Sequence, residues 1–149
     1  NRCAWAAEWS GVNEPNAHVP PVQARDMAKE GIGADWPVFG PYSPGVKVGG
    51  VIWLAGQIAP EAGDEIQEQT KGCLAKIDSL LAAAGVSKHE ICFSQVILKD
   101  IADFAALNEV YSEWVGDTPV PPARATYGAS LPAGAKVEIV VQAIDENCC

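Results

Sequence analysis

Two charged side chains stand out because they interrupt apolar, strand-like sequence near the end of the chain. Glu138 is the only carboxylate in the run Lys136–Ile144, and Arg124 begins another such run directly after Pro121 and Pro122. A carboxylate in an apolar strand has to be paired, solvated in a cleft or shifted in pKa. A guanidinium offers a planar fork that suits a carboxylate. From spacing alone, a structural salt bridge between Arg124 and Glu138 at the sheet edge is the commoner explanation, and a functional role needs further support.

Other catalytic and metal-binding patterns in the sequence are weak. His18 and His89 are the only histidines, and His89 lies in an expected exposed loop, so no Ser-His-Asp or Cys-His signature forms. Gly31-Ile32-Gly33 lacks the preceding strand and following helix of a nucleotide-binding loop. The acidic run Glu61–Glu68 suits a solvated loop and the start of a helix. We therefore expect no metal ion.

The cysteines do not indicate a disulfide framework, because there are five of them at irregular spacing. Cys73 and Cys92 lie inside apolar patterns and are expected to be buried, reduced thiols. The pair Cys148-Cys149 has no histidine nearby, which argues against a zinc site there.

Composition narrows the class of protein. The chain has 149 residues, 48% hydrophobic and 19% charged, which fits one globular domain. Lys and Arg total 10 against 19 Asp and Glu, giving a net charge of -9, which argues against wide nucleic-acid contact. No apolar run approaches the roughly 18 residues of a membrane span. No signal peptide is visible, so we expect an intracellular protein, either cytoplasmic or, if a targeting segment was removed, in a mitochondrion or plastid.

The elements that must position Arg124 and Glu138 follow from periodicity. Apolar residues recur every three or four positions from Ile66 to Ala84, which predicts a helix that stops at Gly85. Gly49-Gly50 between two β-rich runs predicts a tight hairpin. A strand is expected over Ile91–Lys99, followed by a second helix that Asp100 or Asp103 caps and Gly116 ends.

Two strands, about 124–129 and 136–144, complete the order ββαβαββ. Along the last strand, alternation places Glu138 on the face opposite Val137, Ile139, Val141 and Ala143. This order predicts an α+β domain with two helices on one face of a mixed sheet. The strands are too apolar for the other face to meet water, so we expect an oligomer.

Residues 1–40 differ from the predicted domain at 41–149. They hold four prolines and three of the five tryptophans, namely Trp5, Trp9 and Trp36, without a strong period. We expect an N-terminal extension that lies across the surface of its own domain or a neighbouring subunit, with one helical turn near Val22–Glu30. The alternatives are a disordered arm and a segment that binds a protein partner.

A set of motifs in one order resembles the Rid family, also called YjgF/YER057c/UK114. The motifs are Gly40-Pro41-Tyr42-Ser43-Pro44, Val46-Lys47-Val48-Gly49, Ala55-Gly56-Gln57-Ile58, Phe104–Tyr111, Pro122-Ala123-Arg124, and Leu131-Pro132 leading to Val137-Glu138-Ile139. The resemblance extends from about Gly40 to Ala143. It implies a chorismate-mutase-like fold and a homotrimer with sites between its subunits.

The resemblance also implies an activity. Better-known members hydrolyse 2-iminobutanoate, 2-iminopropanoate and their enamine tautomers to 2-keto acids and ammonia, without a metal or organic cofactor. By correspondence, Arg124 binds the substrate carboxylate and Glu138 lies near the attacking water. Tyr42 lines the cleft, and Gly56 and Asn108 fall near the pocket.

Three departures from the family pattern bear on activity. Thr126 stands where relatives often have Cys or Ser, so a substrate-binding hydroxyl is kept. Ala55 replaces a common serine, and the loop from Gln57 to Glu65 is short. They leave open an alternative, a non-catalytic small-acid-binding or assembly protein on the same trimeric fold. Ribonuclease activity, reported for some relatives, is opposed by the net charge of -9.

Overall fold

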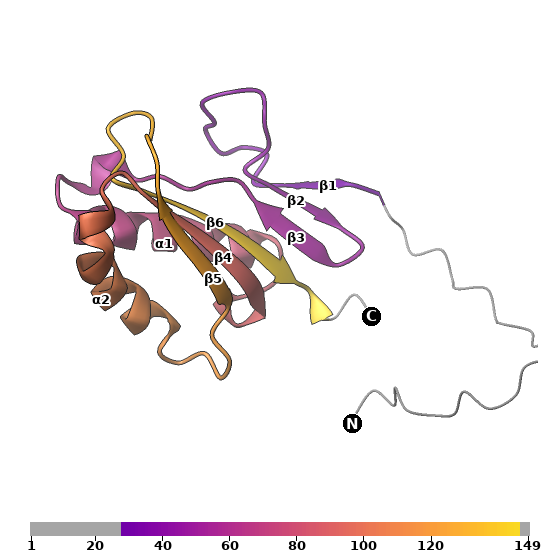
Figure 1. Cartoon of the computed structure of the whole chain (residues 1–149). Coiled ribbons are helices and arrows are strands. Elements are labelled where there is room, and N and C mark those ends of the chain that lie inside the picture. Colours follow the sequence, from indigo (N-terminus) through magenta and orange to yellow (C-terminus); the bar gives the residue numbers. More distant parts are fainter. Residues whose placement is uncertain (1–27, 147–149) are drawn as a thin grey trace, which may run out of the picture.

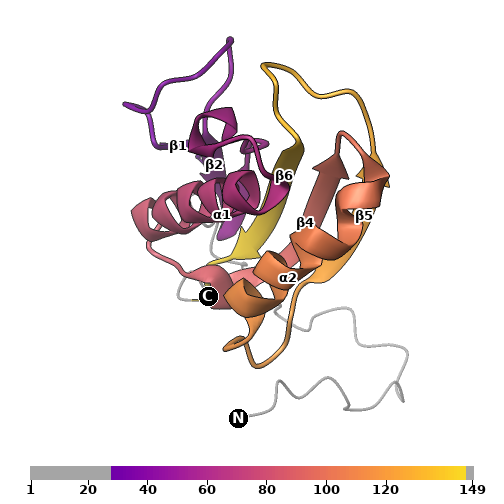
Figure 2. The ribbon, with the colours of Figure 1, turned by 90° about the vertical axis from the view of Figure 1, so that its left-hand side faces the viewer.

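The computed structural model describes residues 28–146, in which six strands form one mixed sheet and two helices pack on a single face of it (Figures 1 and 2). The strands are β1 (Glu30–Ile32), β2 (Gly45–Val48), β3 (Val51–Leu54), β4 (Ile91–Leu98), β5 (Ala123–Gly128) and β6 (Val137–Ile144). The helices are α1 (Ile66–Ala83) and α2 (Phe104–Val115), with short 3-10 turns η1 (Pro60–Ala62), η2 (Lys88–Glu90) and η3 (Ile101–Asp103). The predicted α+β class and its ββαβαββ order are confirmed, with β1 in addition.

The order of strands across the sheet is β1-β2-β3-β6-β4-β5. β4 and β5 run parallel, and the other neighbouring pairs run antiparallel. A parallel pair needs a long crossover, which α2 provides. The last two strands of the sequence are therefore not neighbours, because β4 lies between them. This arrangement decides how far apart Arg124 and Glu138 lie.

Glycines end α1 and turn the first hairpin as the sequence predicts. Gly85 follows α1 with φ +81°, and the N–H groups of Gly85 and Val86 donate to Ala82 and Leu81. This is the Schellman pattern that satisfies the last carbonyls of a helix. Between β2 and β3, Gly49 and Gly50 have φ of 54° and 88°, as a tight hairpin turn with two left-handed residues requires.

The core lies between the helices and the sheet, and β4 departs from its predicted pattern there. Ile91, Ser94, Val96 and Leu98 are buried, whereas Cys92 is exposed. The prediction that Cys92 is a core thiol is wrong, because an irregularity in the pairing with β6 between Ile91 and Phe93 shifts the alternation. Cys73 is buried as predicted, and its burial raises the pKa of its thiol to about 12.

The sheet takes in residues that the sequence assigned to the N-terminal extension. β1 pairs with β2, and the partly buried Trp36 packs against the core. The helical turn expected near Val22–Glu30 lies outside the described residues up to position 27, and Glu30 itself starts β1. Trp5 and Trp9 also lie outside them. Within residues 28–146, no helix combines the length and hydrophobicity needed to cross a membrane.

Candidate functional site

Glu138 lines a pocket of about 820 Å³ at one end of the sheet. The loop that joins β1 to β2 and the loop that joins β5 to β6 both lie at this end (Figures 1 and 2). The lining residues are Trp36, Pro37, Val38, Phe39, Tyr42, Pro44, Gly56, Gln57, Ile58, Glu61, Lys76, Pro132, Ala133 and Glu138. Three predicted site residues, Tyr42, Gly56 and Glu138, therefore share one pocket.

Gly56 lies against the Glu138 carboxylate because the chain after β3 stays beside β6. The N–H of Gln57 donates to the Ile139 carbonyl at 2.9 Å, and the N–H of Ile139 donates to the Gln57 carbonyl at 3.0 Å. A Cβ atom at Gly56 would overlap the Glu138 carboxylate and come within 2.7 Å of its Cδ. Glycine is thus the residue that this approach permits.

Two hydrogen bonds order chain segments at the pocket. The Gln57 side chain donates to the Ala55 carbonyl at 2.8 Å. On the other side of the pocket, the Phe39 N–H donates to the Tyr42 hydroxyl at 3.3 Å. Tyr42 is thereby oriented within its loop while its ring remains exposed.

One cation, Lys76 of α1, lines the same pocket, and it is already paired. Its ammonium lies 2.6 Å from the Glu61 carboxylate and donates to the Ile58 carbonyl at 2.6 Å. The hydrogen bond from Lys76 lowers the pKa of Glu61 below its ordinary value. This pair fixes η1 to α1 at the rim of the pocket.

Arg124 lies elsewhere, on the helix-facing side of β5, where α2 holds it. Its Nη2 donates to Asn108 Oδ1 at 2.8 Å. Its Cζ lies 4.7 Å from the Tyr111 ring centroid and 5.7 Å from that of Phe104. Phe104, Asn108 and Tyr111 occupy one face of α2 at spacings of four and three. Within residues 28–146 no carboxylate forms a salt bridge with Arg124.

The pKa of Tyr111, whose ring packs on Arg124, depends on its burial and on two neighbouring side chains. Burial raises the pKa of Tyr111, while the Ser94 hydroxyl and the Arg124 guanidinium oppose the shift. Thr126 shares the strand face of Arg124, and its buried hydroxyl has no hydrogen-bond partner among the described residues. Asn108, Arg124 and Thr126 therefore form a second group of predicted site residues.

The two groups do not meet within one chain. Arg124 pairs across β4 with Ser94, and Glu138 pairs across β4 with Ile97. Two strand spacings and three residues along β4 separate their Cα atoms by roughly 14 Å. Their side chains also point to opposite faces, because Arg124 contacts α2 whereas Glu138 alternates with the helix-facing Val137 and Ile139. The prediction of a structural salt bridge between Arg124 and Glu138, which their spacing favoured, is therefore wrong.

Sequence reasoning missed part of both groups. Phe104 and Tyr111 fall within the expected second helix, but the sequence did not assign them to Arg124. Their spacing around Asn108 is the signal that could have found them. Trp36 and Phe39 come from the loop between β1 and β2, and Lys76 comes from α1. Both segments are far from Glu138 in the sequence, and no local pattern links them to it.

Comparison with known proteins identifies the family of the chain. Residues 34–145 match the family model described as Endoribonuclease L-PSP. The Reactive Intermediate Deaminase A, chloroplastic, of Arabidopsis thaliana is 33% identical over 128 residues, which cover 79% of this chain and 67% of that protein. The chain belongs to the Rid family. A RutC family protein of Pyrococcus abyssi is 42% identical over 115 residues, covering 72% of this chain and 89% of that protein.

Solved structures support the same Rid fold. A Rid-family protein of Yersinia pestis superimposes with a TM-score of 0.74 at 32% identity, covering 79% of this chain and all of that one, 100%. A YjgF-family protein of Neisseria meningitidis gives 0.73 at 34% identity, covering 81% and 98%. The predicted family and fold are thus confirmed.

Proposed function

We propose that the chain hydrolyses reactive 2-imino acids, and their enamine tautomers, to 2-keto acids and ammonia. The observation that carries the proposal is Arg124: α2 holds its guanidinium by one hydrogen bond and two aromatic rings, and no carboxylate of residues 28–146 neutralises it. Such a group suits the carboxylate of a small ligand. The Arabidopsis relative named Reactive Intermediate Deaminase A supports the reaction class.

The reaction needs positioning and one proton carrier. Arg124 would hold the substrate carboxylate in a bidentate pair and so orient the adjacent C=N carbon. Water adds its oxygen to that carbon while Glu138 accepts a proton. The proton passes to nitrogen, the C–N bond breaks, and the two hydrogens of water leave on ammonia as the keto group forms. No cofactor enters this scheme.

We also propose that two copies of the chain complete each site, because one chain cannot bring Arg124 to Glu138. One copy would present Asn108, Arg124 and Thr126, and another would present Tyr42, Gly56 and Glu138. A ring of three such copies, each offering both halves, would close with three equal sites. The exposed apolar side chains near β5 support this proposal.

We also propose that the protein works in the cytoplasm or in an organelle.

The test is keto-acid formation while a serine or threonine dehydratase supplies the enamine. Arg124→Ala is expected to lower kcat/KM by about 100-fold, or about 2.7 kcal/mol, because a charge-assisted pair is lost. Glu138→Gln should lower kcat by roughly 100-fold or more. Lys99→Ala, an exposed cation outside both groups, is the matched control and should act as wild type.

Two outcomes would contradict the proposal. Wild-type protein that gives no acceleration over buffer would contradict turnover, and tight keto-acid binding without turnover would favour the alternative, a small-acid-binding protein. An Arg124→Ala variant with full activity would remove the guanidinium from the reaction. The ribonuclease named in the family description gains no support from a chain with 10 Lys and Arg against 19 Asp and Glu.

A further inference from the structure

The pocket beside Glu138 is larger than an alanine-derived imino acid requires. Its volume of about 820 Å³ lies toward the upper end of the range of small-molecule sites, roughly 300–1,000 Å³. Glu138 and Gly56 mark the part of the pocket where the imine carbon would lie under the proposed function. A second copy that brings Arg124 to this pocket takes part of the remaining volume, and the rest is available to the side chain of the substrate.

Aromatic and aliphatic side chains surround that volume. Trp36, Phe39 and Tyr42 come from the loop between β1 and β2, and Ile58 from the segment after β3. Phe39 is 85% exposed, and Val38 beside it is also exposed. Apolar surface of this kind gains about 25 cal/mol for each Å² that a ligand covers. The pocket thus favours an apolar substituent.

The charges of the pocket disfavour an acidic substituent. Glu61 and Glu138 both line it, and either carboxylate would repel a second negative charge on the substrate. Lys76, the one cation among the lining residues, is already paired with Glu61 at 2.6 Å and bonded to the Ile58 carbonyl, so little of its charge is left to attract a second carboxylate. A side-chain carboxylate on the substrate would therefore meet two carboxylates and one cation that is already paired.

We propose that this chain prefers 2-imino acids with bulky apolar side chains, such as those derived from leucine and phenylalanine. The inference rests on the proposed function and concerns the same site. The carboxylate would bind Arg124 of one copy, and the side chain would pack against Trp36, Phe39 and Ile58 of another.

The experiment supplies the imino acids one at a time. An amino-acid oxidase acts on alanine, leucine, phenylalanine or glutamate, and semicarbazide traps the imine that the wild-type protein leaves unhydrolysed. We expect kcat/KM for the leucine- and phenylalanine-derived imines to exceed that for the alanine-derived imine at least tenfold, as one added methylene alone can give roughly tenfold. The glutamate-derived imine should be the poorest substrate.

Two exposed apolar positions supply matched variants. Phe39→Ala should bring the ratio of phenylalanine- to alanine-derived kcat/KM close to one. Val120→Ala, in the loop between α2 and β5 at the other end of the molecule (Figure 1), should leave that ratio unchanged.

The outcomes separate the two proposals. Equal rates for the alanine- and leucine-derived imines, or rapid hydrolysis of the glutamate-derived imine, would overturn the preference while leaving imine hydrolysis intact. Hydrolysis of none of the four imines would overturn the proposed function itself.

Discussion

At the residue scale, Gly56 and Glu138 show how a small and a charged residue depend on each other. The carboxylate of Glu138 occupies the space that any side chain at position 56 would take. Backbone hydrogen bonds between Gln57 and Ile139 keep the two segments together, so neither can move away at little cost. Glycine at position 56 is therefore required by the placement of the acid.

Gly56→Ala tests this dependence. The added Cβ should turn the Glu138 carboxylate away from the pocket and lower kcat/KM by about 100-fold, the loss typical of a misplacement of about 1 Å. Gly31→Ala is the control, because nothing lies within 4 Å of a Cβ built there. Steady-state kinetics and circular dichroism of both variants make the comparison. Wild-type activity in Gly56→Ala would show that the position of this carboxylate does not limit the reaction.

At the residue scale, the alternation of side chains along a strand predicts the buried face of β6 correctly and part of that of β4 incorrectly. On β6 it places Glu138 opposite the buried Val137 and Ile139, and the structure confirms this. On β4 the same rule puts Cys92 in the core, and the irregularity beside Ile91 makes that wrong. A bulge changes the phase of a strand by one residue, and nothing in the local residue types announces it.

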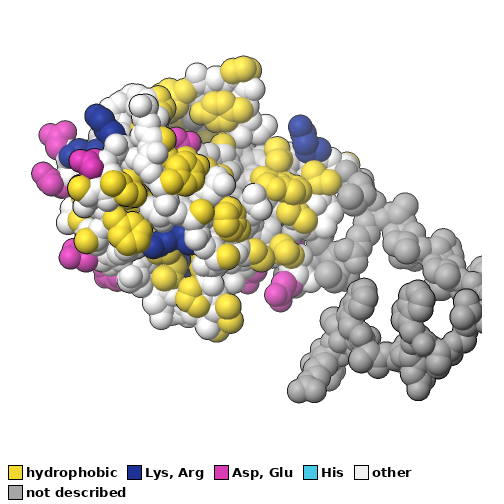
Figure 3. Space-filling view, viewed as in Figure 1, with side chains coloured by type: hydrophobic (Ala, Val, Ile, Leu, Met, Phe, Trp, Pro, Cys, Tyr) yellow, Lys and Arg dark blue, Asp and Glu magenta, His cyan; other side chains and the backbone are white. Residues whose placement is uncertain are grey.

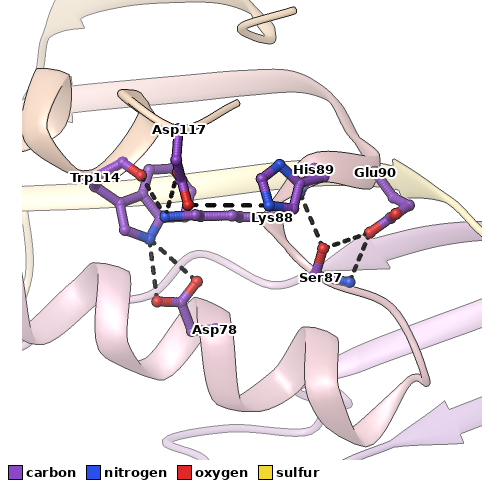
Figure 4. Close-up of polar contacts among 7 residues, drawn as sticks. All are labelled: Asp78, Ser87, Lys88, His89, Glu90, Trp114 and Asp117. Carbon is purple, nitrogen blue, oxygen red and sulfur yellow. Dashed lines mark hydrogen bonds and ion pairs between the residues drawn. The ribbon is translucent and has the colours of Figure 1, made fainter. Parts of the chain in front are cut away.

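At the element scale, α2 holds Arg124 and is itself fixed at its C-terminal end. Trp114 donates from Nε1 to both Asp78 carboxylate oxygens, at 3.1 and 3.0 Å (Figure 4). The Trp114 and Tyr111 rings pack edge to face with centroids 5.5 Å apart. Contacts between α1 and α2 thus reach the ring that supports the guanidinium.

Tyr111→Leu is expected to weaken keto-acid binding. Loss of the ring 4.7 Å from the guanidinium removes about 1–2 kcal/mol of cation–π stabilisation and frees Arg124 to move, which corresponds to roughly tenfold in Kd. Tyr111→Phe keeps the ring and should bind almost as wild type. Isothermal titration with pyruvate or 2-ketobutyrate measures both. Unchanged affinity in Tyr111→Leu would contradict a positioning role for this ring.

Charged side chains beside the C-terminal end of α2 predict how the stability of the fold depends on pH. Lys88 lies 2.8 Å from Asp117 and donates to the Trp114 carbonyl at 2.7 Å (Figure 4). The hydrogen bond from Lys88 holds the pKa of Asp117 below its ordinary 3.8, and that from Ser87 lowers the pKa of Glu90 below 4.5. A carboxyl with a lowered pKa stabilises the fold above its ordinary pKa, and this contribution is lost as pH falls through the lowered value.

Urea unfolding midpoints should therefore stay level from pH 7 to about 5 and decrease below pH 4.5. Lys88→Met should lower the midpoint at pH 7, and its difference from wild type should shrink as Asp117 becomes protonated. The effect is small because Asp117 is exposed. If the urea midpoints of wild type and Lys88→Met differ by the same amount at every pH from 7 to below 4.5, the Lys88–Asp117 pair does not contribute to the pH dependence.

Elements were more predictable than their arrangement. Helix positions and stops followed from the period of apolar residues and from Gly85 and Gly116, which the structure confirms. The insertion of β4 between β5 and β6 is set by long-range pairing, which no local pattern encodes. That insertion is what moves Arg124 and Glu138 apart. β1 was missed because three residues are too few to show a period.

At the scale of the whole molecule, the side on which β5 forms the sheet edge has the features of an interface. Figure 3 shows hydrophobic side chains spread over this side, with acidic ones mainly toward the helices. Phe104, which packs against Arg124, and Tyr127 of β5 are 41% and 44% exposed. An uncovered edge strand with apolar neighbours favours pairing with another chain. This agrees with a site that a second copy completes.

Mixing two impaired variants tests the shared site most directly. Arg124→Ala and Glu138→Gln are each expected to lose about 100-fold in activity, and they are combined in equal amounts, dissociated and allowed to reassemble. If each site takes Arg124 from one copy and Glu138 from another, random assembly restores about one quarter of wild-type activity. If one chain held the complete site, every site in the mixture would lack one of the two groups. Activity that stays at the level of the separate variants, with mixed oligomers shown by mass spectrometry, would contradict the account.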